Sequence, residues 1–298
     1  MYETILIPVD GSEHAIRAAE HGSRLAEAFD ATVHLLNVVD IHSAAGLFNA
    51  GGVDEEFIER IEAEGQEAID AAEDAIEQAE QVETAMVRGD PSEEILEYVD
   101  DHGIGLITMG THGRTGVNRY IAGSVTERVV RLSEVPVLTT RATSESDPTG
   151  GYEEILIPTD GSEPADAAVE HALAIASQTG ARIHAVSVVD VQGTQMNPEY
   201  TRIAELREYL TEEAERAVDD IVTRAEEAGV DAVRSVSTGS PAATLLEYVD
   251  DHDVDLVAMG TAGRTGLDRY LLGSTTERMI RRCQVPVLAV NAGTRARR

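Results

Sequence analysis

Glycine and serine residues recur in the same order and spacing at two places in the 298-residue chain. Each copy has two glycines separated by two residues, followed after nine more residues by a Gly-Ser pair. Glycines let the backbone turn tightly so that several N–H groups point at one place, and the N–H groups at the start of a helix attract an anion. The spacing therefore predicts a phosphate-binding loop in each half of the chain. Its residues are Gly110, Gly113, Gly116, Gly123 and Ser124 in the first copy, and Gly260, Gly263, Gly266, Gly273 and Ser274 in the second.

The residues around this loop fit the same chemistry, with one alternative. Arg114 and Arg264 follow the second glycine of each copy, where a guanidinium could neutralise phosphate charge. Ser124 and Glu127 also fit a capping box, as do Ser274 and Glu277, in which the serine only caps its own helix. A cap alone does not explain four glycines around one turn, so we favour phosphate binding.

A second candidate group ends the first predicted strand of each copy. Asp10 and Asp160 stand there, where an aspartate can accept hydrogen bonds from a ribose or an amino group. The alternative is a local Asp-Gly turn that needs no ligand. Neighbouring candidates for a base pocket are Pro8 and Val38 in the first copy and Pro158 and Val188 in the second.

The glycine loops belong to a repeat that covers nearly the whole chain. More than half of the positions between Gly89 and Thr140 carry the same residue 150 positions later. The chain is therefore two copies of one domain, each of a usual size for a single core. A polar segment rich in turn formers separates the copies and predicts a flexible linker. We expect a first domain over residues 1–141, a linker over 142–151 and a second domain over 152–293.

Short apolar runs alternate with helical patterns in each copy, which predicts a doubly wound α/β fold with a parallel sheet. In the first copy the expected strands cover residues 4–9, 32–39, 84–88, 106–109 and 135–139, and the expected helices cover 15–29, 54–83, 92–101 and 124–132. Ser12 is the expected N-cap of the first helix, and a loop is expected over 43–52. Such sheets bind ligands beyond the carboxyl ends of their strands, where the strand order reverses. All the candidate residues fall at that edge.

Composition restricts the class of partner. The formal net charge is −32 and all 23 basic residues are arginine, which predicts adaptation to a salt-rich cytoplasm because salt screens the repulsion between acidic groups. The same charge argues against nucleic acid or an anionic membrane as a partner. Cys283 is the single cysteine and the histidines show no metal-site spacing, so we predict neither a disulfide nor a metal site. No segment is apolar enough to span a membrane, and we expect a cytoplasmic protein.

Three ordered motifs resemble those of the universal stress proteins. They are Ile-Leu-Ile-Pro-x-Asp-Gly-Ser at the start of each copy, the glycine motif late in it, and a closing Val-Pro-Val-Leu strand. The resemblance spans both copies and implies a tandem member with a five-stranded parallel sheet in each domain. It also implies that the glycine motif binds ATP or AMP, with Mg²⁺ as an accompanying ion.

The resemblance assigns roles residue by residue. In the first copy it implies that Pro8, Asp10 and Val38 hold the adenosine, and that the ribose and phosphates are held by Met109, Gly110, Gly113, Arg114, Gly123, Ser124 and Val125. The matching residues of the second copy are Pro158, Asp160, Val188, Met259, Gly260, Gly263, Arg264, Gly273, Ser274 and Thr275. Thr275 replaces Val125, which leaves equal affinity at the two sites open. The family also pairs domains through the last strand, here residues 135–139 and 285–289; further homodimerisation stays open.

Three functions remain as hypotheses. The preferred one is a nucleotide-binding sensor or signalling module of the stress response, read by an unknown protein partner. The second is an enzyme with weak ATP hydrolysis at most. We identify no catalytic residue for it, because the chain has neither a paired-carboxylate centre nor a Walker lysine. The third is a nucleotide-independent docking or chaperone-like protein, against which the two intact glycine motifs count.

Overall fold

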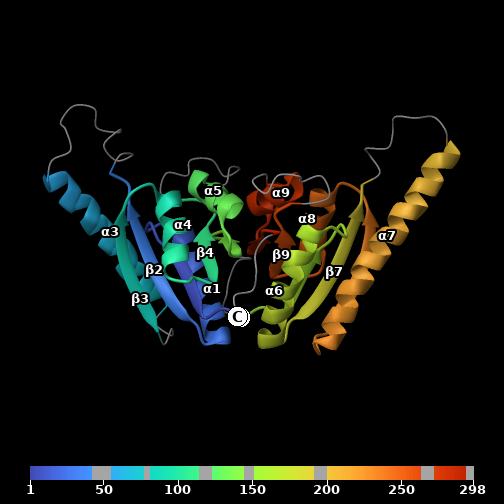
Figure 1. The fold of residues 1–298 in the computed structure, drawn as a ribbon, viewed down its shortest axis with the longest axis horizontal. Helices are drawn as coiled ribbons and strands as arrows, with labels where there is room; N and C mark the ends of the chain where they lie inside the picture. The colour runs from blue at the N-terminus through green and yellow to red at the C-terminus, as the bar shows by residue number, and fades with distance from the viewer. Residues whose placement is uncertain are drawn as a thin grey trace. The chain divides into compact units, whose positions relative to one another are not determined.

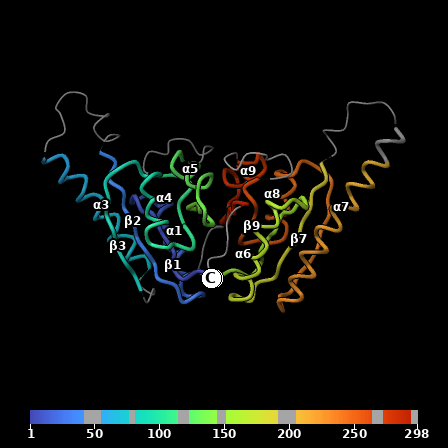
Figure 2. Tube along the Cα trace, in the orientation of Figure 1, coloured from blue at the N-terminus to red at the C-terminus, as the bar shows by residue number. Residues whose placement is uncertain are grey.

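The computed structural model describes residues 1–41, 55–76, 81–113, 123–143, 151–190, 200–262 and 272–292. The chain divides into two compact units, with the division between residues 148 and 149 (Figure 1). Each unit contains a parallel sheet with helices packed against it, as the trace in Figure 2 also shows. The predicted doubly wound α/β fold is therefore confirmed.

The first unit alternates strands and helices along the chain. Its elements are β1 (Thr4–Pro8), α1 (Glu13–Phe29), β2 (Thr32–Val39), α3 (Glu55–Ala75), β3 (Val82–Arg88), α4 (Pro91–Asp101), β4 (Leu106–Gly110), α5 (Ser124–Leu132) and β5 (Val137–Thr140). The strands pair in parallel in the order β3-β2-β1-β4-β5. The strand order therefore reverses between β1 and β4, which is where ligands bind in doubly wound sheets.

The sequence explains why these elements form. Ile5, Leu6 and Ile7 of β1 are completely buried, as expected of a central strand that is covered on both faces. The hydroxyl of Ser12 accepts a hydrogen bond from the Ala15 N–H at 3.2 Å, so the predicted N-cap of α1 is confirmed. Helices α1 and α3 pack against each other, and α4 packs against α5, so the sheet lies between two helical layers (Figure 1).

The second unit repeats this arrangement. Its elements are β6 (Glu154–Pro158), α6 (Glu163–Thr179), β7 (Arg182–Val189), α7 (Tyr200–Glu227), β8 (Ala232–Thr238), α8 (Pro241–Asp251), β9 (Leu256–Gly260), α9 (Ser274–Arg282) and β10 (Val287–Val290). The strands pair in parallel in the order β8-β7-β6-β9-β10. The reversal of strand order falls between β6 and β9. Among the described helices of both units, none is long and apolar enough to cross a membrane.

Some predicted limits are wrong: the last strand, expected over 135–139, covers Val137–Thr140, and the largest difference is in helix α3. The helix expected over 54–83 ends at Ala75, and Val82 and Glu83 belong to β3 instead, where they pair with Val33 and His34 of β2. The residues before Val82 are acidic and favour a helix, and they contain no local signal that would end one. The pairing of Val82 with the distant strand β2 therefore determines where β3 begins. The loop expected over 43–52 and residues 144–150 of the expected linker lie outside the described residues. Pairing through the last strands stays a prediction.

Candidate functional site

A cavity of about 490 Å³ opens at the carboxyl ends of β1, β2 and β4 in the first unit. It lies where the strand order reverses, the position that this fold predicts for a ligand. Nine predicted residues from separate segments line it: Pro8, Asp10, Val38, Met109, Gly110, Gly113, Gly123, Ser124 and Val125. The fold thus brings residues that are far apart in the sequence to one cavity wall. The wall also contains residues that were not predicted, among them Asp40, Asp90, Ile95 and His112.

The start of α5 beside this cavity differs from the predicted capping box. The N-cap residue is Gly123, whose carbonyl accepts the Glu127 N–H at 2.9 Å, and no side chain caps the helix. Ser124 is the first helical residue and is exposed, so its hydroxyl does not serve as the cap. Gly273 and Ser274 repeat this geometry at α9. The capping-box prediction is therefore wrong in both copies, and a cap no longer accounts for either serine.

Two glycines of the motif are required by packing. A Cβ on Gly110 would lie 2.8 Å from the backbone carbon of His14 at the start of α1. A Cβ on Gly260 would meet the backbone carbonyl of Pro164 at the start of α6 even more closely. These contacts are too short for any side chain, so Gly110 and Gly260 are needed whether or not a ligand binds.

Gly123 has a different environment. The nearest atom to a Cβ built on it is the Thr111 carbonyl oxygen at 3.4 Å, which is close to an ordinary contact. Its φ of −58° is accessible to any residue. Neither packing nor backbone conformation therefore requires glycine here. Because the N-cap residue is glycine, no cap side chain covers the N–H groups in the first turn of α5, which lies at the cavity wall.

Asp10 forms the local turn that was the alternative to ligand binding. Its Oδ1 accepts the Ser12 N–H at 3.0 Å, and Asp160 accepts the Ser162 N–H at the same distance. Asp10 also lines the cavity, and a Cβ on Gly113 would lie 2.5 Å from its Oδ2. The turn therefore fixes the carboxylate at the cavity wall, and the two interpretations are compatible.

Asp90 is a lining residue that was not predicted. Its Oδ1 caps α4 by accepting the N–H groups of Ser92 and Glu93, each at 3.1 Å. Arg128 of α5 lies 3.3 Å from this Oδ1 and 2.7 Å from Oε1 of Glu93. Hydrogen bonding from the Ser92 hydroxyl is the main cause that lowers the pKa of Asp90. The Gly-Asp-Pro sequence at Gly89 signals a helix start, but only the packing of α4 beside α5 places this carboxylate in the cavity.

Two histidines meet beside the first cavity. The ring centroids of His14 and His112 are 5.2 Å apart, and Nδ1 of His112 lies 3.0 Å from the Thr111 hydroxyl oxygen. Burial first, and then His112 and Arg141, lower the pKa of His14. A neutral ring offers hydrogen bonds rather than positive charge. Ala262 replaces His112 in the second copy, so this pair is a feature of the first unit.

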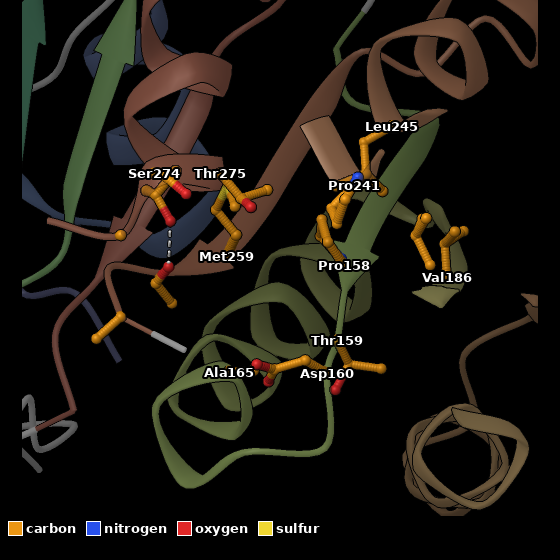
Figure 3. Close-up of a pocket in the computed structure, with 15 residues that line it drawn as sticks. Pro158, Thr159, Asp160, Ala165, Val186, Pro241, Leu245, Met259, Ser274 and Thr275 are labelled. Atoms are coloured by element: carbon orange, nitrogen blue, oxygen red, sulfur yellow. Dashed lines mark hydrogen bonds between the residues drawn. The ribbon is translucent and has the colours of Figure 1, made fainter. Parts of the chain in front are cut away.

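A cavity of about 270 Å³ has the corresponding position in the second unit (Figure 3). Figure 3 shows its wall formed from the end of β6, from α8 and from the start of α9, with the labelled residues Pro158, Asp160, Pro241, Leu245, Ser274 and Thr275. The predicted residues that line it are Pro158, Asp160, Val188, Met259, Gly260, Gly273, Ser274 and Thr275. Arg114, Gly116, Gly263, Arg264 and Gly266 lie outside the described residues, so their roles stay predictions.

Comparison with known proteins decides the family. A family model described as the Universal stress protein family matches residues 1–141 and 151–291. The chain belongs to the universal stress protein family. The two matches confirm a tandem universal stress protein. Within the described residues it has no group of three or more His, Cys, Asp or Glu side chains that could hold a metal ion.

Similar proteins come from archaea and bacteria. Universal stress protein MJ0531 of Methanocaldococcus jannaschii is 40% identical over 139 residues, which are 46% of this chain and 81% of that protein. Universal stress protein YxiE of Bacillus subtilis is 32% identical over 148 residues, 47% of this chain and 100% of that protein. The crystal structure of a universal stress protein from Archaeoglobus fulgidus has a TM-score of 0.70 at 23% identity and covers 97% of this chain and 96% of that one. This last similarity shows that the two-domain fold is shared.

Proposed function

We propose that each unit binds one adenine nucleotide, ATP or AMP, and that this universal stress protein acts as a cytoplasmic nucleotide sensor or signalling module in the stress response. The observation that carries the proposal is the convergence of nine predicted residues on one cavity at the reversal point of the first sheet. The uncapped start of α5 adds to it, because the α5 N–H groups and helix dipole favour an anion.

Each part of the cavity wall suits a different part of the ligand. The apolar residues Pro8 and Val38 would contact the base, and the carboxylate of Asp10, fixed by its turn, would accept the ribose hydroxyls. The backbone N–H groups at Gly123 and Ser124 would hold the phosphates. Mg²⁺ would arrive on the phosphates, since Mg²⁺ commonly binds through substrate phosphates together with one or two carboxylates.

Isothermal titration of ATP and of AMP into nucleotide-stripped protein tests the proposal. We suggest about 1 M KCl, where the Debye length is about 3 Å and acidic self-repulsion is screened. We expect two sites per chain. Ser124→Glu and Ser274→Glu each place a negative charge in one phosphate cradle, so each variant should lose one site. Both serines are exposed and an acid in the first turn of a helix is favourable, so the fold should be retained.

The matched control is Ser177→Glu, which makes the same change at an exposed position of α6 that lines neither cavity. It should bind as the unaltered chain does. If folded protein, verified by circular dichroism, binds neither nucleotide, the proposal is wrong and a nucleotide-independent docking protein becomes the better hypothesis.

A further inference from the structure

The two cavities differ in the charges around the predicted phosphate position. Resting on the proposed function, we propose that the two sites discriminate by ligand charge: the second unit prefers the nucleotide with more phosphates, and the first unit does not. Arg278 and the absence of two carboxylates near it carry this preference.

The first cavity contains more negative charge. Asp10, Asp40 and Asp90 all line it. Among the described residues that line the second cavity, Asp160 is the one carboxylate. Ser240 stands where the first copy has Asp90. A phosphate entering the first cavity therefore approaches the Asp90 carboxylate, which Ser240 replaces in the second copy, whereas Asp40 keeps its counterpart, Asp190, in the sequence.

Positive charge differs in the opposite sense. Arg128 is on α5, one turn beyond Ser124, and is paired with Asp90 and Glu93 of α4 at 3.3 and 2.7 Å. These two carboxylates, of which Asp90 lines the cavity, neutralise its charge. An arginine paired in this way is less available to a phosphate, because the phosphate would have to displace carboxylates from the same guanidinium.

Arg278 has the corresponding position on α9 without these partners. It is exposed and lies one turn beyond Ser274, hence on the same side of the helix. Ser240 and Ala243 replace the two carboxylates of the first copy. In the part of the chain that the structure describes, Arg278 makes no hydrogen bond or ion pair. Its charge is therefore available to an added phosphate at the start of α9.

The N-termini of α4 and α8, which lie at the first and second cavity, also differ in charge, with less negative charge at the second. Asp90 places a negative charge on the N–H groups at the start of α4. Ser240 is the N-cap of α8, and its side chain makes no cap hydrogen bond. The positive end of the α8 dipole is thus not offset by a cap carboxylate. Each of these differences makes the second cavity more favourable for an anion than the first.

Single-site chains separate the two preferences. Ser274→Glu leaves the first site open, and Ser124→Glu leaves the second open. Titration of metal-free ATP and AMP, with a chelator present and at low and high KCl, gives the ratio of the two affinities at each site. An exposed ion pair changes an equilibrium by up to about fivefold. We expect the ATP-over-AMP preference to be about fivefold larger at the second site, and the difference to shrink as salt rises.

Exchanging the residues between copies tests the cause. Ser240→Asp with Ala243→Glu, made in the chain whose second site is open, should pair Arg278 and lower the ATP-over-AMP ratio to that of the first site. Asp90→Ser with Glu93→Ala, made in the other chain, should raise it. Positions 93 and 243 are exposed and serine is a good N-cap, so both exchanges should preserve the fold.

The outcomes are distinct. Equal ATP-over-AMP ratios in the two single-site chains, or ratios that the exchanges do not move, would overturn this inference while two nucleotide sites per chain still stood. Absence of any binding to the unaltered chain would overturn the proposed function and this inference together.

Discussion

The hydroxyl of Thr126 donates a hydrogen bond to the carbonyl oxygen of Gly110 at 2.7 Å and thereby joins the first turn of α5 to the end of β4. Thr276 makes the same bond to Gly260 at 2.8 Å in the second unit. Both threonines are buried, at 3% exposure. The two elements proposed to hold the phosphates are therefore held to each other by one side chain, independently of any ligand.

Replacing this side chain should affect both stability and binding. Thr126→Val keeps the shape but leaves the Gly110 carbonyl without this donor, which should destabilise the protein by about 1–3 kcal/mol. It should also weaken nucleotide binding at the first site, because the start of α5 is no longer fixed against β4. Chemical denaturation and calorimetric titration measure the two effects. Thr276→Val should instead weaken nucleotide binding at the second site. If either variant loses stability without any change in nucleotide affinity, the bond only supports the fold.

The glycines of the motif should not respond alike to alanine. Gly110→Ala and Gly260→Ala force a Cβ into the backbone of the adjacent helix and should cost about 1–3 kcal/mol of stability each. Gly123→Ala meets no such contact and should stay within about 1 kcal/mol of the unaltered chain. The midpoint of urea unfolding distinguishes them. Equal loss at all three positions would contradict the packing described for Gly110 and Gly260.

The stability should depend on pH through His171 of α6. Burial lowers the pKa of this histidine to about 4, against about 6.5 in an unfolded chain. The native state therefore keeps it neutral while the unfolded state takes up a proton. This stabilisation is fully present above pH 6.5 and is lost as the pH falls from about 6.5 to about 4, by about 2–3 kcal/mol.

The variant His171→Leu isolates that contribution, because the other groups titrate in both chains. The difference in unfolding free energy between the two proteins should change between pH 6.5 and 4 and be constant above pH 7. A difference that does not vary across this range would show that His171 is not held neutral in the native protein.

Salt should stabilise the protein. A net charge of −32 opposes the compact state, and about 1 M KCl shortens the Debye length from about 10 Å at 0.1 M to about 3 Å. The thermal midpoint should therefore rise steadily over this range. Potassium glutamate at equal ionic strength is the control for a specific effect of chloride. A midpoint that is insensitive to both salts would contradict the prediction of a salt-adapted protein.

Elements with strong local signals could be predicted from the sequence. The strand over Thr32–Val39 and the helix over Ser124–Leu132 have the predicted limits. In the strand a run of β-branched and apolar residues ends at each boundary, and in the helix the helical spacing of apolar residues does. The end of α3 could not be predicted, since the pairing of Val82 with Val33 of a distant strand decides it. Nonlocal pairing is the kind of information that residue patterns lack.

The site, too, could be predicted only in part, because some of its geometry depends on contacts that the local sequence does not encode. The motif marks Gly123 and Ser124, but a Ser-x-x-Glu sequence fits a cap position and a first helical position equally well. Only the backbone bond from the Glu127 N–H to the Gly123 carbonyl shows which residue is the cap. Asp90 reaches the cavity because α4 packs beside α5, a tertiary contact that its own sequence neighbourhood does not encode.

The close contact between Gly260 and the backbone of Pro164 limits what a glycine motif can tell about a duplicated gene. A copy that no longer bound a ligand would still lose stability if this glycine were replaced. Retention of Gly260 is therefore explained by packing and is not by itself evidence that the second copy binds a ligand. Position 243 is exposed and position 240 carries different N-cap residues in the two copies, so substitutions at these two positions are better evidence of functional divergence than the retained glycine is.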